Sequence, residues 1–201
     1  MKIRKANVKD VKELALLHLQ IFDNFFMSSL GVGFLKSYYK TAIKYSKTIC
    51  LVSVDDNGNI QGFVLGRVQT RGYLKKLLIR GLPTFFIQGV TLIFTNPKIL
   101  LRLAKNLEKK GQKNGFNDKQ NYSEIGLIGV KPELKGRGIG HQLLHVFEKE
   151  AKEQGAKKLS LTTDYYNNEH TLKVYKAWGF EIYYDFISYP NRRMYRLIKD
   201  I

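Results

Sequence analysis

A glycine-rich turn late in the sequence combines the residue types that bind phosphate. Three glycines remove side chains where the backbone could approach a ligand, and glycine accepts a positive φ angle without strain. The residues after the turn have the apolar spacing of a helix, and a helix begins with unpaired N–H groups and a positive dipole end. Lys135 and Arg137 add positive charge at the same point. The stretch therefore predicts a pyrophosphate-binding loop. Its glycines are Gly136, Gly138 and Gly140.

The spacing of these glycines excludes two other phosphate loops. A Walker loop needs Gly-x4-Gly-Lys-Ser/Thr, which the sequence lacks. A dinucleotide fingerprint needs Gly-x-Gly-x-x-Gly after the first strand, whereas this run is Gly-x-Gly-x-Gly and comes late. The run Lys135-x-x-Gly138-x-Gly140 instead resembles the Arg/Gln-x-x-Gly-x-Gly/Ala loop of the GNAT superfamily of acyl-CoA N-acyltransferases, with lysine at the first position. For this segment alone, an ordinary glycine-rich turn between a strand and a helix is the alternative.

A second segment resembles another signature of the same superfamily, Asn-x6-Tyr-x3-Gly-Phe. The two segments occur in the family's order and separation, and the joint match covers roughly residues 120–182. Together they imply that the chain binds acyl-CoA. The residues in register with the second signature are Asn168, Tyr175, Gly179 and Phe180.

The resemblance implies that acetyl-CoA enters between two strands that part. Backbone groups of Ile128 and Val130 would then pair with the amides of the pantetheine arm, as an added strand would. Gly129 and Pro132 support such a break, because glycine marks bulges or close backbone approach and proline cannot donate to the ladder. A routine strand end is the alternative. The cofactor-binding residues implied in this way are Ile128, Gly129, Val130, Lys135, Gly136, Arg137, Gly138, Ile139, Gly140, His141 and Asn168.

Transfer of an acyl group from a thioester to an amine needs a neutral amine, a stabilised oxyanion and a proton for the departing thiolate. Tyr175 stands where the family places its general acid, and an ordinary phenol with a pKa near about 10 is protonated at neutral pH. The backbone N–H of Val130 is the implied donor to the thioester carbonyl. Packing of Tyr175 beside Val174 and Trp178 is the alternative role.

The general base is predicted from spacing within the same resemblance. Some family members carry a glutamate eleven residues before the first loop position, and Glu124 has that spacing to Lys135. Others place a carboxylate five residues before the asparagine, where this chain has Thr163. Glu124 is therefore the predicted base, and Asp164 is the second candidate. The alternative interpretation of Glu124 is a surface carboxylate at a strand edge. The four histidines show no metal-ligand spacing, so no metal is expected.

Hydrophobic periodicity predicts alternating helices and strands. The resemblance arranges them as an α/β (α+β) fold, a mixed and mostly antiparallel sheet that is flanked by helices and splayed where the cofactor enters. A turn signal at 55–59 predicts a hairpin of the two strands beside it. The expected strands are 3–5, 48–54, 60–68, 124–130, 158–163, 181–187 and 193–198, and the expected helices are 8–22, 33–45, the segment from the loop to about 154, and 169–177.

The composition fits one domain, residues 1–201, with a continuous core. The only cysteine, Cys50, excludes an internal disulfide and suits a reducing compartment. Because Cys50 lies in the apolar stretch 48–54, a buried strand thiol is expected. The first ten residues carry charges but no apolar segment of the signal-peptide kind. A cytoplasmic protein is therefore expected.

Residues 69–121 are predicted to form a helical insertion between two central strands that family members usually join by a short turn. The insertion should shape the acceptor site. It contains an apolar run, 82–94, flanked by lysines and arginines, and this run is shorter than the about 20 residues that span a bilayer. A helix that caps the core is one interpretation, and an interfacial segment on an anionic membrane is the other. Residues 105–119 are expected to form a mobile basic loop.

The formal net charge of +17 calls for an anionic partner. Coenzyme A, a nucleotide-linked sugar, a lipid pyrophosphate, ribosomal RNA or an anionic membrane would each exploit this charge. No nucleic-acid motif is present, so a nucleic-acid partner is not expected.

The acceptor is predicted from a further resemblance. Residues 25–39 resemble an early helical segment of bacterial GNAT proteins associated with surface-polysaccharide synthesis, which favours an amino sugar or a nucleotide-linked amino sugar. The alternative acceptors are a protein or peptide amine and another small amine. The alternative function is a non-catalytic module that binds acyl-CoA, membrane or nucleic acid. The strand edge at 183–189 also predicts a homodimer.

Overall fold

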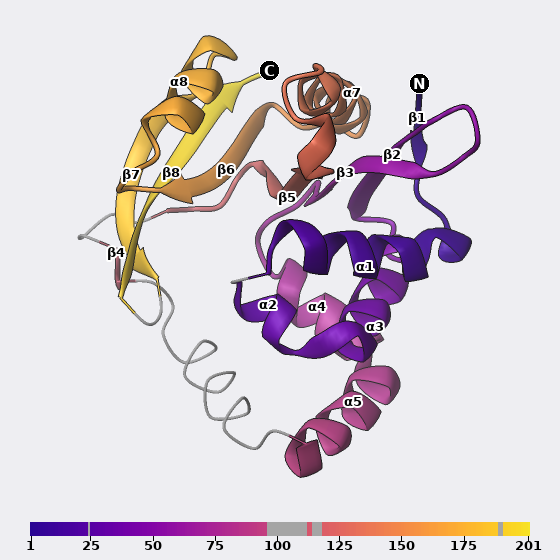
Figure 1. The fold of residues 1–201 in the computed structure, drawn as a ribbon. Coiled ribbons are helices and arrows are strands. Elements are labelled where there is room, and N and C mark those ends of the chain that lie inside the picture. The colour runs from indigo at the N-terminus through magenta and orange to yellow at the C-terminus, as the bar shows by residue number, and fades with distance from the viewer. Residues whose placement is uncertain (24, 96–111, 114–117, 189–190) are drawn as a thin grey trace.

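The strands of the chain form one sheet in the computed structural model (Figure 1). The structure describes residues 1–23, 25–95, 112–113, 118–188 and 191–201. The strands are β1 (Lys2–Lys5), β2 (Thr48–Val54), β3 (Ile60–Arg67), β4 (Gln112–Lys113), β5 (Ser123–Val130), β6 (Lys158–Asp164), β7 (Glu181–Ser188) and β8 (Arg192–Asp200). The helices are α1 (Val11–Ile21), α2 (Phe26–Ser29), α3 (Gly31–Ile43), α4 (Tyr73–Arg80), α5 (Leu82–Thr95), α7 (Ile139–Glu153) and α8 (Glu169–Ala177), with short 3-10 turns at Val8–Asp10 and Pro132–Leu134.

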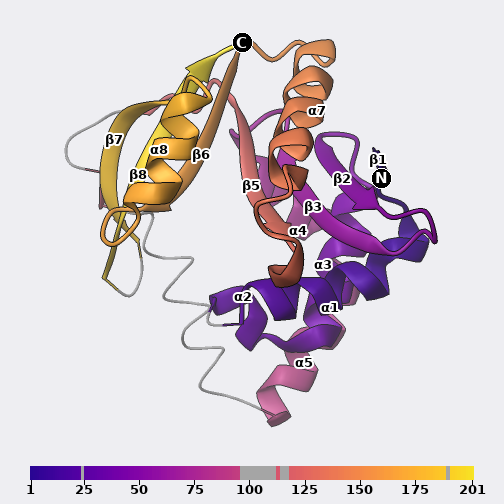
Figure 2. The same ribbon diagram turned by 45° about the horizontal axis from the view of Figure 1, so that its top comes forward.

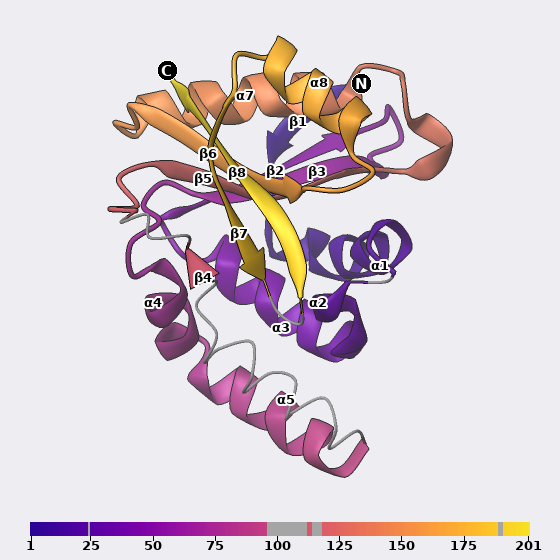
Figure 3. The same cartoon turned by 90° about the vertical axis from the view of Figure 1, so that its left-hand side faces the viewer.

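The strand order in the described residues is β1-β2-β3-β5-β6-β8-β7-β4, and only β5 and β6 pair in parallel. The other neighbours are antiparallel. Figure 3 shows α1, α2 and α3 on one face of the sheet and α7 and α8 on the other. The predicted fold class, a mixed and mostly antiparallel sheet flanked by helices, is confirmed.

Strand β2 shows why both faces of the sheet are covered. Its residues 49–52 are all apolar, and successive side chains of a strand point to opposite faces. Cys50, Val52 and Val54 join the core beneath α1 and α3. Ile49 and Leu51 join the core beneath α7. Cys50 is buried, as predicted, and burial raises the pKa of its thiol to about 12, so the thiol stays protonated.

The turn between β2 and β3 has the geometry that its sequence predicts. The carboxylate of Asp55 accepts hydrogen bonds from the backbone N–H groups of Asn57 and Asn59 at 3.0 and 2.8 Å. Gly58 has a φ angle of +86°, which residues with a side chain rarely adopt. The predicted hairpin is therefore confirmed.

The insertion after β3 begins with two helices that pack on α3. α4 contributes Tyr73 and Leu77 to the core, and the ring centroid of Phe85 in α5 lies 5.6 Å from that of Phe34. The apolar run 82–94 lies within α5, so it is helical, and whether it also contacts a membrane stays a prediction. The loop predicted at 105–119 lies mostly outside the described residues. Within the described part of the chain, no helix combines the length and apolar character needed to cross a membrane.

The insertion returns to the sheet before β5. The two residues of β4 pair with β7 opposite Phe186 and Ile187. Part of the strand edge predicted to form a homodimer is therefore occupied by the chain's own insertion. Dimerisation stays a prediction.

Candidate active site

The parallel pair β5 and β6 opens partway along its length. The pairing covers Ser123 to Ile125 on β5 and Leu159 to Leu161 on β6, and it ends there. β5 continues beside β3, while β6 continues beside β8 up to Asp164. Figure 2 shows the two strands together at their starts and apart at their ends. The fold therefore contains the splay at which the cofactor was expected to enter.

A cavity of about 480 Å³ lies at this opening. Its volume falls within the about 300–1,000 Å³ that is typical of small-molecule sites. The walls come from the segment before α2, from both parting strands, from α8 and from β8. The lining residues are Phe22, Phe25, Ile125, Gly126, Leu127, Ile128, Leu161, Thr162, Thr163, Asp164, Thr171, Tyr175, Arg192 and Met194.

The backbone of β5 presents polar groups to the opening. The N–H of Lys131 donates to the carbonyl oxygen of Gln61, on the β3 side, at 2.9 Å. Alternate residues of an antiparallel strand direct their N–H and C=O groups to opposite sides. Ile128 and Val130 therefore direct theirs away from β3 and toward the opening. These are the two residues predicted to pair with the amides of an extended ligand.

The glycine-rich loop leaves its backbone accessible. Gly136 and Gly138 have φ angles of +80° and +77°, and a Cβ atom at either position would meet no other atom within 4 Å. Backbone conformation, and not packing, therefore requires glycine at these two positions. Helix α7 follows directly, and its first regular hydrogen bond runs from the N–H of Gln142 to the carbonyl of Gly138. The N–H groups of residues 136–141 remain available to an anion.

The side chains predicted to bind the cofactor differ in their surroundings. Lys135 and Arg137 are exposed at the mouth of the loop, so both can contribute charge to an anion site. The ring of His141 instead packs edge-on against Trp178, with 4.1 Å between the centroids. The His141 ring therefore connects α7 to the end of α8.

Close packing explains why residue 129 is glycine, which the sequence alone did not reveal. A Cβ atom there would come within 2.8 Å of Ile21 on α1. A side chain at this position would force the side chain of Ile21 to shift. By contrast, a Cβ at Gly140 would lie 3.8 Å from Val130, which is an ordinary contact.

Tyr175 reaches the cavity from α8. Its ring lies 6.0 Å from that of Phe180, in an edge-on arrangement. Within the described residues, the Tyr175 hydroxyl has no hydrogen-bond partner, and the side chain lines the cavity. Burial raises the pKa of this phenol above its ordinary value, so the hydroxyl is protonated at neutral pH. Packing of the ring and a place on the cavity wall thus occur together.

Asn168 fixes the connection between β6 and α8. Its side-chain N–H groups donate to Oγ1 of Thr163 at 2.5 Å and to the carbonyl of Asp164 at 2.9 Å. Both amide hydrogens are therefore used within the protein. This arrangement positions the helix that carries Tyr175, and direct binding of the cofactor by Asn168 stays a prediction.

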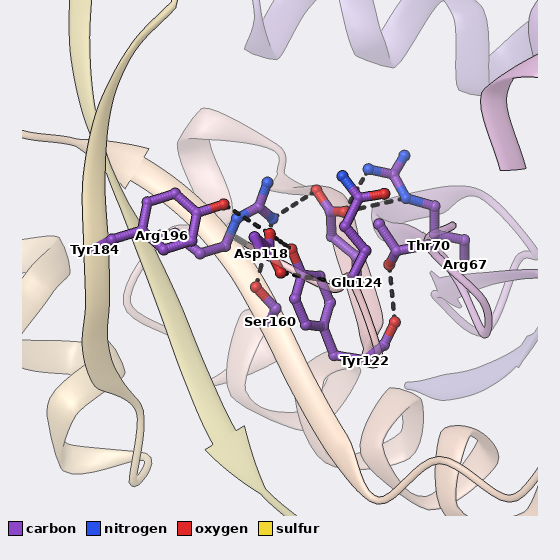
Figure 4. A network of polar contacts seen from close by, with 9 residues as sticks. Arg67, Thr70, Asp118, Tyr122, Glu124, Ser160, Tyr184 and Arg196 are labelled. Carbon is purple, nitrogen blue, oxygen red and sulfur yellow. Dashed lines mark hydrogen bonds and ion pairs between the residues drawn. The ribbon is translucent and has the colours of Figure 1, made fainter. Parts of the chain in front are cut away.

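Glu124 is buried and held by two arginines (Figure 4). The residue is 5% exposed, so the alternative of a surface carboxylate is wrong. One carboxylate oxygen lies 2.5 Å from Nη2 of Arg67 on β3, and the other lies 2.9 Å from Nη1 of Arg196 on β8. Burial raises the pKa of this carboxyl, but the two positive charges and their hydrogen bonds outweigh burial and bring the pKa below its ordinary value. Glu124 is not one of the described residues that line the cavity.

The Arg67–Glu124–Arg196 bridge connects three strands at the closed end of the splay, just before β5 and β6 part.

A second set of hydrogen bonds beside this bridge fixes both ends of the insertion (Figure 4). Asp118 accepts hydrogen bonds from the hydroxyls of Tyr122 and Tyr184 at 2.5 and 2.7 Å. Thr70 donates to the carbonyl of Tyr122 at 2.8 Å. The two ends of the insertion are therefore joined beside the ion pairs.

Asp164, the second candidate base, lies on the cavity wall at the end of β6. Its carboxylate forms a two-point ion pair with Nε and Nη2 of Arg192. Both side chains are about equally exposed, at 39% and 38%. Asp164 is therefore a carboxylate in contact with the cavity, in contrast to Glu124.

Comparison with known proteins identifies the family. A family model described as the acetyltransferase (GNAT) family matches residues 19–180. The chain belongs to the GNAT acetyltransferase family. No curated protein matches the sequence closely enough to count as a relative.

Solved structures share the GNAT fold of this chain at low sequence identity. A crystal structure described as an acetyltransferase is 20% identical, covers 100% of both chains and has a TM-score of 0.69. An aminoglycoside 6'-N-acetyltransferase in complex with coenzyme A is 13% identical, with a TM-score of 0.63, covering 100% of this chain and 97% of that one. The ribosomal-protein-S18-alanine N-acetyltransferase from Escherichia coli is 11% identical, with a TM-score of 0.63, covering 100% of this chain and 93% of that one. At these identities the likeness establishes the fold alone.

Arg192, a cation on the wall of the cavity, was not among the predicted site residues. Arg192 lines the cavity, and its guanidinium carbon lies 4.8 Å from the ring centroid of Phe25. Arg192 and Arg196 stand four residues apart on β8, and such residues share one face of a strand. The sequence shows that β8 contains several arginines but does not say what they face.

A substitution in the loop tests its backbone geometry. We expect Gly138→Ala to raise the dissociation constant for acetyl-CoA and to destabilise the protein by about 1–2 kcal/mol, because alanine is strained at a left-handed φ angle. Gly140→Ala is the matched control, since Gly140 has no positive φ angle and its Cβ would make an ordinary contact. Titration calorimetry and thermal unfolding of both variants provide the measurement. Equal behaviour of the two variants would contradict the assigned geometry.

Proposed function

We propose that this GNAT protein transfers an acetyl group from acetyl-CoA to a primary amine, directly and within a ternary complex. The observation that carries the proposal is the cavity at the β5–β6 splay, where the accessible hydroxyl of Tyr175 and the outward backbone of β5 meet. The family match and the glycine-rich loop support the same cosubstrate.

The cosubstrate follows the path that these groups define. The pyrophosphate binds the free N–H groups of residues 136–141, beside the charges of Lys135 and Arg137. The pantetheine arm then runs along β5 and pairs with the backbone of Ile128 and Val130, as an added strand would. This path delivers the thioester to the cavity wall that carries Tyr175.

The transfer is a single addition and elimination. The nitrogen lone pair of the amine attacks the thioester carbon, and the N–H of Val130 donates to the oxyanion that forms. The carbon–sulfur bond then breaks, and the sulfur takes up a proton from Tyr175 while the amine loses one to a base.

Two carboxylates compete for the role of base. Glu124 has the family spacing, but its pKa is lowered and both of its oxygens are already paired with arginines. Asp164 contacts the cavity and is partly exposed. We keep Glu124 as the base to be tested first, with Asp164→Asn as the parallel variant. A carboxylate that is ionised throughout the neutral range is a weak base, so the amine has to arrive largely deprotonated.

An amino sugar, free or nucleotide-linked, is the acceptor that we propose. The segment 25–39, whose sequence resembles polysaccharide-associated GNAT proteins, contributes Phe25 to the cavity wall. Polar groups of Thr162, Asp164 and Arg192 lie on the same wall, and a concave site with a few convergent polar groups suits a small polar ligand. A protein or peptide amine is the alternative acceptor. A cytoplasmic location stays a prediction.

Thiol release from acetyl-CoA tests the proposed function. The purified protein is offered amino sugars, nucleotide-linked amino sugars, polyamines and peptides, and free coenzyme A is measured for each. Release with one sugar class, together with the acetylated sugar by mass spectrometry, is the expected result. Release only with peptides would reassign the acceptor. If acetyl-CoA binds and no amine releases thiol, the chain is a binding module and the proposed activity is wrong.

A further inference from the structure

The described part of the insertion carries exposed apolar side chains on two consecutive helices. On α4, Leu74 and Ile79 are 51% and 56% exposed, and on α5, Leu82 and Phe86 are 57% and 72% exposed. Single exposed apolar residues are normal on any protein, whereas a large contiguous group of them marks a contact surface. The acetyl transfer proposed above makes no use of this surface.

The inner and outer faces of these helices are distinct. Leu77 holds α4 in the core, and Phe85 packs α5 on Phe34 of α3. Leu82 and Phe86 are four residues apart, so they lie together on another face of α5. Figure 1 shows α5 extending away from the sheet, which leaves this outer face at the periphery of the described fold.

The surrounding sequence carries positive charge without negative charge. Residues 31–54 and 57–107 contain no aspartate or glutamate. Lys75 and Lys76 are exposed on α4 beside the apolar side chains, and Arg71 is exposed just before the helix. The exposed charged residues on and just before α4 are therefore all positive.

A second cavity, of about 390 Å³, opens where α3, α4 and α5 meet. Lys40, Lys44 and Arg80 line it together with Thr41, Pro83 and Thr84, and no acidic residue is among them. The guanidinium carbon of Arg80 lies 4.7 Å from the ring centroid of Tyr45, which holds the charge in place. Lys40 and Lys44 repel one another at this spacing on a helix, and an anion in the cavity would relieve the repulsion.

We propose that the corner formed by α3, α4 and α5 docks on a membrane that contains anionic phospholipid. Leu82 and Phe86 enter the boundary between headgroups and acyl chains, as on an interfacial helix. The cavity lined by Lys40, Lys44 and Arg80 receives the phosphate of one lipid headgroup. The protein lies on the membrane and does not span it.

The combination of groups favours a bilayer over other anionic partners. A nucleic acid would use the cations but would leave aliphatic side chains such as Leu82 and Ile79 in water. A second copy of this chain would bring the same positive charge against itself and be repelled. An anionic bilayer matches both the apolar and the cationic components.

Sedimentation with lipid vesicles tests the proposal on the full chain. We expect binding to vesicles that include phosphatidylglycerol and much weaker binding to vesicles of phosphatidylcholine alone. Lys40→Gln with Lys44→Gln should weaken binding by about tenfold or more, because each basic residue near the surface contributes to the attraction. Leu82→Ser with Phe86→Ser should weaken it in both low and high salt, since burial of apolar area is not screened.

Matched controls and a competing partner complete the test. Lys149→Gln with Lys157→Gln removes the same charge from exposed positions in and after α7, on the other face of the sheet, and should leave binding unchanged. Equal losses in this control would reduce the effect to net charge and overturn the proposed site. The membrane proposal would be overturned if the protein bound no vesicles. It would also be overturned if the protein bound an RNA oligonucleotide instead, in a way that depends on Lys40 and Lys44. Thiol release in solution is measured separately, so failure of either proposal is distinguishable.

Discussion

Replacement of Tyr175 by phenylalanine should lower kcat by about 10²–10⁴-fold, the range for a lost positioned acid or base. The dissociation constant for acetyl-CoA and the unfolding temperature should change little. The reason is structural: the ring packs against Phe180, while the hydroxyl has no hydrogen-bond partner in the described residues and lines the cavity. Phenylalanine keeps the ring contacts and removes only the proton donor. Steady-state thiol release, calorimetric titration and thermal unfolding measure the three quantities.

The pH dependence adds a second readout for the same residue. A general acid must be protonated, so its loss appears as a fall in rate when pH rises through its pKa. Because burial raises the pKa of Tyr175 above its ordinary value, this fall should come only above about pH 10. Tyr166→Phe is a matched control, since Tyr166 is 64% exposed, and its kcat should stay unchanged. A Tyr175→Phe variant with unaltered kcat would remove the acid assignment.

Features encoded by local spacing could be predicted from the sequence. The positive φ angles of Gly136 and Gly138 follow from glycines placed between a strand and a helix. Strand β2 was recognisable because a strand buried on both faces is apolar without alternation. In such segments, one stretch of chain determines the local conformation, so residue types and their spacing carry the information.

Features that join distant segments could not be predicted. Arg67, Glu124 and Arg196 come from three strands, and only the sheet order brings them together. The spacing that marked Glu124 as a base says nothing of the arginines that lower its pKa. The hydrogen bonds that Asn168 donates to Thr163 and Asp164 at the end of β6 were likewise not predicted. Side-chain direction depends on the neighbours in space, which one sequence does not state.

Replacement of Glu124 by glutamine should destabilise the protein by about 3–5 kcal/mol at neutral pH, because removal of one member of a buried ion pair leaves its partners uncompensated. The arginines left behind, Arg67 and Arg196, have side chains only 27% and 12% exposed. Chemical denaturation at pH 7 measures the loss. Glu153→Gln is the control, since this glutamate is exposed at the end of α7 and its replacement should cost under about 0.5 kcal/mol.

Acidification should reduce the difference between wild type and the Glu124→Gln variant. The folded pKa of Glu124 is depressed below the unfolded value of about 4.3. A depressed carboxyl contributes stability that is present above the unfolded pKa and is lost as pH falls through the folded pKa. The two proteins should therefore have a constant difference in unfolding free energy above about pH 5 and converge below about pH 4. A difference that is independent of pH would contradict the ion-pair account.

A second variant distinguishes the two roles of Glu124, as a member of the ion-pair bridge and as the proposed base. Arg196→Met breaks the bridge but keeps the carboxylate, so it should lose comparable stability and raise the pKa of Glu124. If Glu124 is the base, Arg196→Met should retain turnover at temperatures where it is folded, whereas Glu124→Gln should lose it. If Glu124 only connects the strands, both variants should turn over similarly when folded, and Asp164→Asn should then show the loss. The bridge joins β5 to β3 and β8 at the closed end of the splay, so these variants test the strand framework beside the cavity.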